Sequence, residues 1–250
     1  MLRLPVIRGV IDRRILVNYR VDPEAIARIV PAPFRPKTIH GYAIGGICLI
    51  RLKHLRPKFV PSSFGMTSEN AAHRIAVEWD DENGIAREAV FIPRRDSSSR
   101  FNSLAGGRII PGIHHHATFK VREEDNDYSV ALMSDDGETR VSVMGRVADA
   151  LPSTSIFHSL DEASRFFETG SLGYSATEEA ARFHGLSLRC ETWRVEPLDV
   201  RSVESSFFDD LTRFPAGAAA FDCALLMRGI EHEWESEEDM CCACPRASHL

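Results

Sequence analysis

Strand-like segments joined by short turns follow one another through the middle of this 250-residue chain. Residues 71–79 and 86–92 flank a turn that ends in Asn83-Gly84, and such a pair supplies the positive φ that tight hairpins need. Three more strands are predicted at 114–122, 128–133 and 139–147. Because most of these connections are too short for a parallel crossover, the sequence predicts an antiparallel sheet, closed as a barrel or folded as a double-sheet core.

Helices are predicted to be few and to pack outside this sheet, so the expected fold class is mainly β (α+β). One helix should begin after Asp22, an N-cap residue followed by proline. A second should begin at the capping box formed by Ser159 and Glu162 and end at Gly170. A third short helix is predicted at 207–213, and the remaining strands at 14–19, 41–52, 186–195, 200–205 and 221–228.

Composition places the chain among ordinary globular proteins, with 44% hydrophobic and 26% charged residues. We expect a single domain over 1–235 and a Cys-containing tail over 236–250, in which Cys241, Cys242 and Cys244 lack the spacing of a zinc knuckle. The net charge of -6 argues against a nucleic-acid partner. No apolar stretch is long enough for a membrane span or a signal peptide, so the expectation is a cytoplasmic protein without a membrane partner.

Polar residues gather at the ends of the two hairpin strands. If the hairpin pairs around Asn83-Gly84, residues 69–74 lie opposite residues 94–96, which would bring acid, imidazole and guanidinium groups together. An arginine fork there could bind a carboxylate through two hydrogen bonds. The alternative is an internal network of Arg, Asp and Glu that only holds the strand ends. The candidate substrate-binding residues are Arg94, Arg95, Asn70 and His73.

Three consecutive histidines, His114 to His116, begin the next predicted strand. In a strand His114 and His116 share one face, and either could act as an acid or base near neutral pH. With Glu69 we take them as the candidate catalytic residues. His114 and His116 could instead bind a metal together with Glu69 or His73. No phosphate-binding glycine loop is present, and no cofactor is expected.

Several blocks resemble an uncharacterised bacterial family, YqjF-like, that is related in fold to the acetoacetate decarboxylase superfamily. They are residues 13–23, Ser68-Glu69-Asn70, Ile92-Pro93-Arg94-Arg95-Asp96 and residues 222–228. The resemblance covers most of the chain, and it implies a decarboxylase-like barrel with a small-molecule pocket. It also implies that Glu69 is a pocket acid and that Arg95 binds the substrate carboxylate.

The family resemblance stops at the reactive amine. In the decarboxylases a lysine beside a second lysine follows a Gly-x-Pro turn and forms a Schiff base with the substrate. Here the similar stretch Pro111-Gly112-Ile113 is followed by histidines. The four lysines of the chain stand alone, at Lys37, Lys53, Lys58 and Lys120. The resemblance therefore implies a decarboxylase-like pocket without its Schiff-base lysine.

Three functions fit these residues. The first is a lyase- or isomerase-type pocket for a small organic acid or oxoacid, in which Glu69 and a histidine move protons. The second is a non-catalytic domain that binds or senses such a ligand, and the third is a metal-dependent enzyme that uses His114 and His116. The family resemblance and long β-edges also make a homo-oligomer an expected state.

Overall fold

The computed structural model of the chain describes residues 5–100 and 112–241. Its helical elements are α1 (Pro23–Ala27), η1 (Ser62–Phe64) and α3 (Leu160–Thr169). Its strands are β1 (Ile7–Val21), β2 (Arg35–Pro36), β3 (Thr38–Ile39), β4 (Tyr42–Pro57), β5 (Met66–Asp80), β6 (Ala86–Ser97), β7 (His114–Glu124), β8 (Asp127–Ser134), β9 (Arg140–Val147), β10 (Leu172–Ala176), β11 (Arg182–Cys190), β12 (Glu196–Ser205), β13 (Ala219–Ser236) and β14 (Met240–Cys241). No helix in these two described stretches is both long and apolar enough to cross a membrane.

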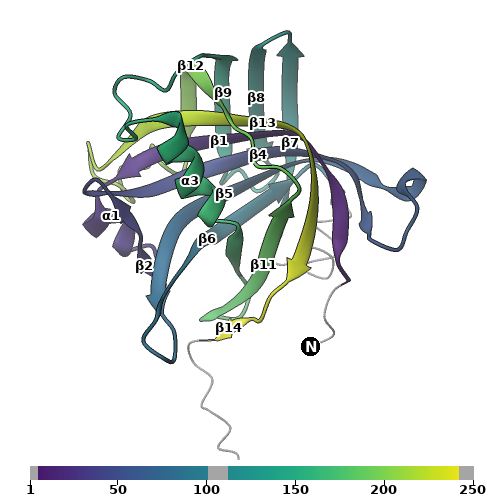
Figure 1. Cartoon of the computed structure of the whole chain (residues 1–250). Helices are drawn as coiled ribbons and strands as arrows, with labels where there is room; N and C mark the ends of the chain where they lie inside the picture. Colours follow the sequence, from purple (N-terminus) through teal and green to yellow (C-terminus); the bar gives the residue numbers. More distant parts are fainter. Residues whose placement is uncertain (1–4, 101–111, 242–250) are drawn as a thin grey trace, which may run out of the picture.

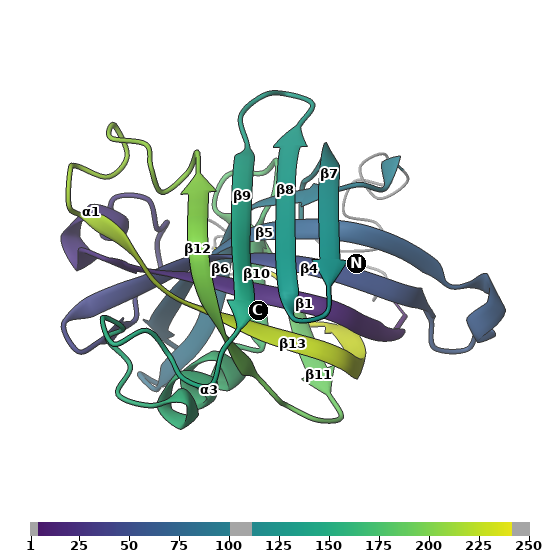
Figure 2. The same cartoon turned by 90° about the horizontal axis from the view of Figure 1, so that it is seen from above.

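One wall of five strands, ordered β13-β1-β4-β5-β6, belongs to two closed rings. Strands β7, β8, β9 and β12 close it into a ring of nine strands, counted over the described residues. Strands β10 and β11 close the same wall a second time, because β10 pairs with β6 and β11 pairs with β13. The nine-strand ring is called here the large barrel and the other the small barrel. Figures 1 and 2 show β7, β8, β9 and β12 crossing over the long strands β1, β4 and β13. The predicted mainly β, closed fold is confirmed.

Both faces of the shared wall are buried. Ile15 and Val17 of β1 face the core of the large barrel, where they join residues of β8 and β9. Leu16 between them faces the opposite side, with Cys48 of β4 and Phe167 of α3. Because successive side chains of a strand point to opposite faces, a wall buried on both sides needs continuous apolar runs. The long apolar run at 41–52 meets this requirement as part of β4.

Strand β6 is the branch point between the two barrels. On one edge it pairs with β5, and on the other it pairs first with β10 at 90–92 and then with β7 at 95–97. Both of these second pairings are parallel, whereas the sequence predicted only antiparallel neighbours. Pro93 lies between the two, where the missing N–H of proline costs no ladder hydrogen bond.

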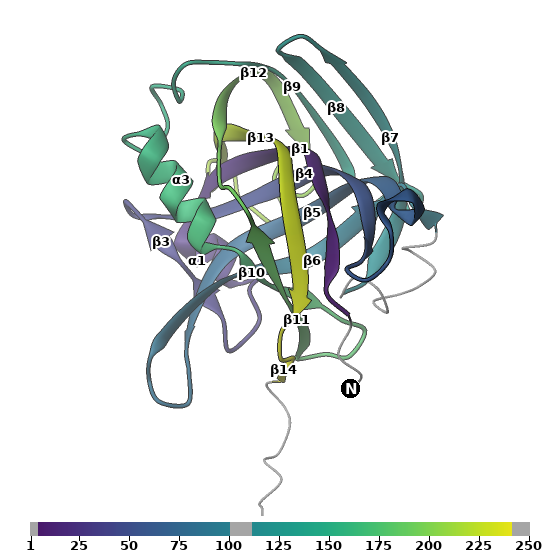
Figure 3. The same ribbon diagram turned by 45° about the vertical axis from the view of Figure 1, so that its right-hand side comes forward.

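Two of the three predicted helices are present. The Asp22 side chain caps α1, and the Ser159 side chain accepts a hydrogen bond from Glu162 N at the start of α3. The predicted helix at 207–213 is wrong, because that segment forms turns. Asp210 Oδ1 accepts from Thr212 N at 2.9 Å, and Asp209 Oδ2 accepts from Ser205 N at 2.7 Å. Such local bonds offer the backbone an alternative to the helix. In Figure 3 α3 lies against the side of the small barrel.

Candidate functional site

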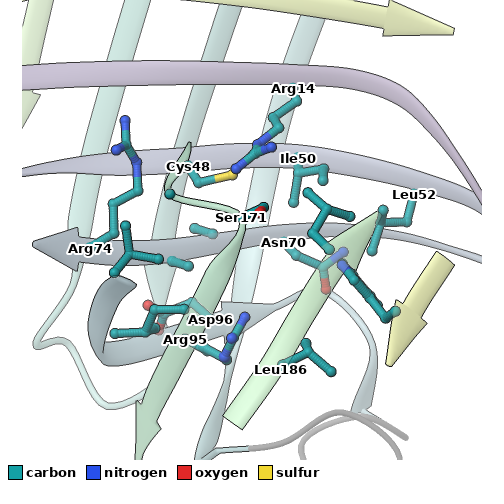
Figure 4. Close-up of a pocket in the computed structure, with 18 of the residues that line it drawn as sticks. Arg14, Cys48, Ile50, Leu52, Asn70, Arg74, Arg95, Asp96, Ser171 and Leu186 are labelled. Carbon is teal, nitrogen blue, oxygen red and sulfur yellow. The ribbon is translucent and has the colours of Figure 1, made fainter. Parts of the chain in front are cut away.

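The small barrel contains a partly open cavity of about 100 Å³ on the face of the wall opposite the large barrel. Its size admits a few water molecules or a small ligand. Most of the lining is apolar, and its larger members come from β4, β6, β11 and β13: Ile50, Leu52, Ile92, Leu186, Leu188 and Trp234. Polar groups project from β1, β5 and β6 (Figure 4), and His114 of β7 also belongs to the lining.

The structure places the candidate binding residue Arg95 in this cavity, where hydrogen bonds hold its side chain in position. Its Nε and Nη2 atoms donate to Ser175 Oγ of β10, at 3.1 and 2.9 Å. Burial lowers the pKa of Arg95 to about 10, so the guanidinium stays charged at neutral pH. Among the described residues its side-chain hydrogen-bond partner is the Ser175 hydroxyl, and no carboxylate pairs with it. The Nη1 side of the fork therefore remains for an anion.

Two further arginines, Arg14 and Arg74, line the cavity and were not among the candidate residues selected from the sequence. Arg74 is buried, donates to Asn18 Oδ1, and has a pKa lowered by burial to about 10. Arg14 donates from Nε to Cys48 Sγ at 3.2 Å. Both lie in strands whose neighbours are apolar, and a charged residue in a strand buried on both faces is itself a functional signal.

Gly112 packs closely against Ser175, the hydrogen-bond partner of Arg95. It has a φ of +97°, and a Cβ on it would lie 2.7 Å from Ser175 Cβ and 3.5 Å from Arg95 Nε. Its N–H donates to His184 Nδ1 at 3.3 Å. Pro111, which precedes it in the stretch that resembles the decarboxylases, lies outside the described residues.

Asn70 and His114 also line the cavity. The Asn70 side chain is held in place, because Nδ2 donates to Ser68 Oγ at 2.9 Å and Oδ1 accepts from Ser97 Oγ at 2.7 Å. His114 is the neighbour of Arg95 in the parallel pairing of β7 with β6. The predicted opposition of 69–74 and 94–96 is confirmed by the pairing of Ala72 with Arg95.

Glu69 lies away from the cavity in an ion-pair network. Glu69 Oε2 accepts from Arg13 Nη2 at 2.5 Å, and Oε1 accepts from Arg51 Nε at 2.6 Å. Arg13 also donates to Glu123 Oε1 at 2.6 Å. Glu69 follows the alternation of β5, which turns it to the opposite face from Asn70.

Arg94 also turns away from the cavity. It donates to Asp96 and to Asp136 of the turn after β8, and its Nη1 donates to Glu138 at 2.8 Å. Arg94 and Arg95 are adjacent in a strand, so they face different barrels. Arg94 therefore takes part in the structural network that the sequence allowed as an alternative.

His116 and His73 are likewise remote from the cavity lining. His116 Nδ1 lies 2.8 Å from Asp135 Oδ2. His73 is buried in the large barrel with its ring centroid 4.9 Å from that of Phe207. Burial, with the nearby charge of Arg94, lowers the pKa of His73 to about 3. The structure therefore does not bring Glu69, Arg95 and His116 together.

None of the four lysines lines the cavity. Lys37 Nζ lies 2.5 Å from Glu88, Lys53 pairs with Asp12, and Lys58 pairs with Glu233. Lys120 lines a shallow depression on β7, β8 and β9. Among its described lining residues, the cavity therefore offers no lysine amine on which a Schiff base of the decarboxylase type could form.

A group able to hold a metal ion occurs elsewhere, at the turn between β3 and β4. Within the described stretches, His40, His158 and Glu162 are the residues that present three ligand atoms within 4.8 Å of one another. His40 Nε2 lies 2.8 Å from Glu162 Oε1. The pair His114 and His116 does not form such a group with any described residue.

Comparison with solved structures shows the same fold in acetoacetate decarboxylase-like proteins. The acetoacetate decarboxylase from Legionella pneumophila subsp. pneumophila str. Philadelphia 1 is similar with a TM-score of 0.61 and 13% identity, over 94% of this chain and 88% of that chain. The enduracididine biosynthesis enzyme MppR, complexed with pyruvate, is similar with a TM-score of 0.60 and 12% identity, over 96% and 91%. An acetoacetate decarboxylase-like enzyme from Sphingomonas wittichii RW1 has a TM-score of 0.58 and 10% identity, over 95% and 92%. At such identities the likeness establishes the fold and not the activity.

Sequence comparison identifies the family. No curated protein matches the chain at a significant level. Residues 11–224 match the model of the DUF2071 family, described as an uncharacterized conserved protein. This stretch runs from β1 into β13 and includes every described side chain that lines the cavity except Trp234. The chain belongs to the DUF2071 family and has an acetoacetate decarboxylase-like fold.

Proposed function

We propose that this protein binds a small organic acid in the cavity of the small barrel, with its carboxylate on Arg95. The observation that carries the proposal is a charged guanidinium that faces a mostly apolar cavity and has only a neutral hydroxyl partner, Ser175, among the described residues. A buried charge without a counterion is costly, and an anionic ligand would supply the missing partner. The similarly folded MppR is complexed with pyruvate, an oxoacid, which supports the same class of ligand here.

Ligand binding can be tested by thermal unfolding of the full chain with acetate, pyruvate and acetoacetate. We expect the melting temperature to rise with ligand concentration, because a ligand that binds only the folded state stabilises it. In Arg95→Met the rise should disappear, whereas Arg122→Met, which changes an exposed arginine of β7, should behave as wild type. If no acid shifts the transition, or if Arg95→Met shifts it as wild type does, the proposal fails.

Turnover at this site would be lyase- or isomerase-like proton transfer next to a carbonyl. His114 is the imidazole in the cavity lining and is the candidate base, with Arg95 holding the carboxylate. Nuclear magnetic resonance can follow exchange of the pyruvate methyl protons with D₂O. We expect exchange above the uncatalysed rate in wild type and its loss in His114→Gln, with binding retained.

Binding without chemistry is the second candidate function. The fixed positions of Arg95 on Ser175 and of the Asn70 amide favour it, because preorganised hydrogen-bond groups can hold a carboxylate without any group that moves a proton. It predicts a ligand-induced thermal shift with no proton exchange. Borohydride reduction in the presence of pyruvate should leave no lysine adduct under either candidate function, and a stable adduct would overturn both.

A further inference from the structure

The cavity carries more positive charge than one carboxylate can balance. Arg14, Arg74 and Arg95 line it, and the single carboxylate among its described lining residues belongs to Asp96. That carboxylate is already engaged, because Arg94 Nε lies 3.2 Å from both of its oxygens and Arg94 Nη2 lies 2.9 Å from Oδ1. Two guanidinium groups therefore remain after Arg95 has taken its proposed ligand.

The partners of Arg14 and Arg74 are all neutral in the described structure. Arg14 reaches Cys48 Sγ and, at 3.9 Å, Met227 Sδ. Arg74 donates to Asn18, its guanidinium carbon lies 4.9 Å from the centre of the Phe167 ring, and its Nε has no hydrogen-bond partner. Sulfur atoms, an amide and a ring face orient these cations without neutralising them.

Arg14 and Arg95 lie on opposite sides of the cavity. Arg14 is on β1 and Arg95 on β6, with β4 and β5 between them, so about three strand spacings of ~4.8 Å separate their backbones. In Figure 4 Arg14 and Arg74 lie in the upper half of the view and Arg95 in the lower half. Arg14 and Arg74 also line a smaller recess of about 30 Å³ that continues under Phe167.

We infer that the ligand is an organic dianion, a short dicarboxylic acid, with one carboxylate on Arg95 and the other on Arg14 and Arg74. This inference rests on the proposed function and extends it by a second anion subsite. The apolar lining between the two charged ends, which includes Ile50 and Ile92, suits a short hydrocarbon segment between the carboxylates. The second carboxylate supplies the counterion that the described residues do not provide.

Binding of matched mono- and dicarboxylic acids tests the second anion subsite independently of the first. We would measure binding to the full chain by calorimetry with two pairs, succinate against butanoate and glutarate against pentanoate, in which a carboxylate replaces a methyl group. Wild type should bind the dicarboxylate at least about tenfold more tightly, the size expected for one added charge-assisted contact.

The variants assign each carboxylate to its arginine. Arg14→Met should weaken only the dicarboxylates and remove the preference, whereas Arg95→Met should weaken both members of each pair. Arg74→Met should act as Arg14→Met does, and Arg14→Lys, which keeps the charge, should retain part of the preference. Arg122→Met is the control for a lost positive charge at the surface.

The outcomes distinguish the two proposals. Equal affinity for both members of each pair, abolished by Arg95→Met, would overturn the dianion and leave the proposed function standing. A dicarboxylate preference that survives in Arg14→Met and Arg74→Met would overturn the assigned subsite. Failure of every acid to bind the wild-type chain would overturn the proposed function and the dianion with it.

Discussion

At the scale of single residues, Gly112 allows Ser175 and Arg95 to meet. We predict that Gly112→Ala lowers the free energy of unfolding by about 2 kcal/mol and weakens carboxylate binding, because the new methyl group would overlap Ser175 in a backbone conformation that disfavours a Cβ. Gly137→Ala is the matched control, since its φ is +74° and no atom lies within 4 Å of the added Cβ. It should lose about 1 kcal/mol from backbone strain alone and bind as wild type. Urea unfolding and calorimetry measure both effects, and wild-type affinity in Gly112→Ala would contradict the prediction.

Glu69 is predicted to stabilise the fold rather than to act on a ligand. Glu69→Gln would leave Arg13, which is 1% exposed, with Glu123 as its remaining carboxylate, at an expected cost of about 3 kcal/mol. Affinity for carboxylates should not change. Glu124→Gln, in an exposed pair with Arg122, should leave stability unaltered in the same urea experiment. Wild-type stability with lost ligand binding in Glu69→Gln would restore Glu69 to the site.

How far the sequence could specify the site depends on the two buried faces of the wall. The pairing of 69–74 with 94–96 could be predicted, because the Asn83-Gly84 turn sets the register. The face of that pairing that lines a cavity could not be predicted, because alternation of polar and apolar residues identifies the buried face only when the other face is exposed to solvent. In the structure Asn70 and Arg95 line the cavity, whereas their neighbours Glu69 and Arg94 lie on the other face in ion-pair networks.

At the scale of elements, α3 depends on its cap. Ser159 Oγ accepts from Glu162 N at 3.1 Å, and Glu162 Oε2 accepts from His158 N at 2.7 Å. We predict that Ser159→Ala costs about 1 kcal/mol and lowers the hydrogen-exchange protection of amides in α3. Thr177→Ala, which removes a hydroxyl from the turn after β10, is the control and should leave α3 protection as it is. Unchanged protection in Ser159→Ala would show that packing of Phe167 alone holds the helix.

The elements that the sequence predicted are those with strong local signals. Both capped helices and the hairpin of β5 and β6 follow from side chains within a few residues of one another. Strand β10 was missed, because it is five residues long, contains Gly173, and on one edge pairs in parallel with the distant β6, although its other edge pairs with β11. The helix predicted at 207–213 does not form, because the side chains of Asp209 and Asp210 accept hydrogen bonds from nearby backbone amides.

For the whole molecule, buried histidines predict a loss of stability in mild acid. Burial lowers the pKa of His73 to about 3 and that of His232 to about 4, whereas unfolded histidine titrates near 6.5. Below about pH 6.5 the unfolded chain therefore binds more protons than the folded chain, and the free energy of unfolding falls as the pH decreases. Each histidine should contribute a slope of about 1.4 kcal/mol per pH unit until its folded pKa is reached.

The variant His73→Leu tests this pH dependence. It removes one titrating group and two buried nitrogens that have no hydrogen-bond partner among the described residues. Urea unfolding from neutral pH down to about pH 4.5 should show a shallower slope than wild type, by about 1.4 kcal/mol per unit. Leu211→Ala, which changes an exposed side chain without a titrating group, should keep the wild-type slope. Parallel curves for His73→Leu and wild type would contradict a neutral buried His73.

The shared wall makes the two barrels inseparable parts of one folding unit. Its strands come from both ends of the described chain, because β1 lies between β13 and β4. Excising the strands that close either ring would expose one entire apolar side of a sheet that the remaining ring still requires. A shortened gene product that keeps the arginine cavity but discards β7, β8 and β9 should therefore aggregate rather than fold, so the large barrel is a structural precondition for whatever the small one binds.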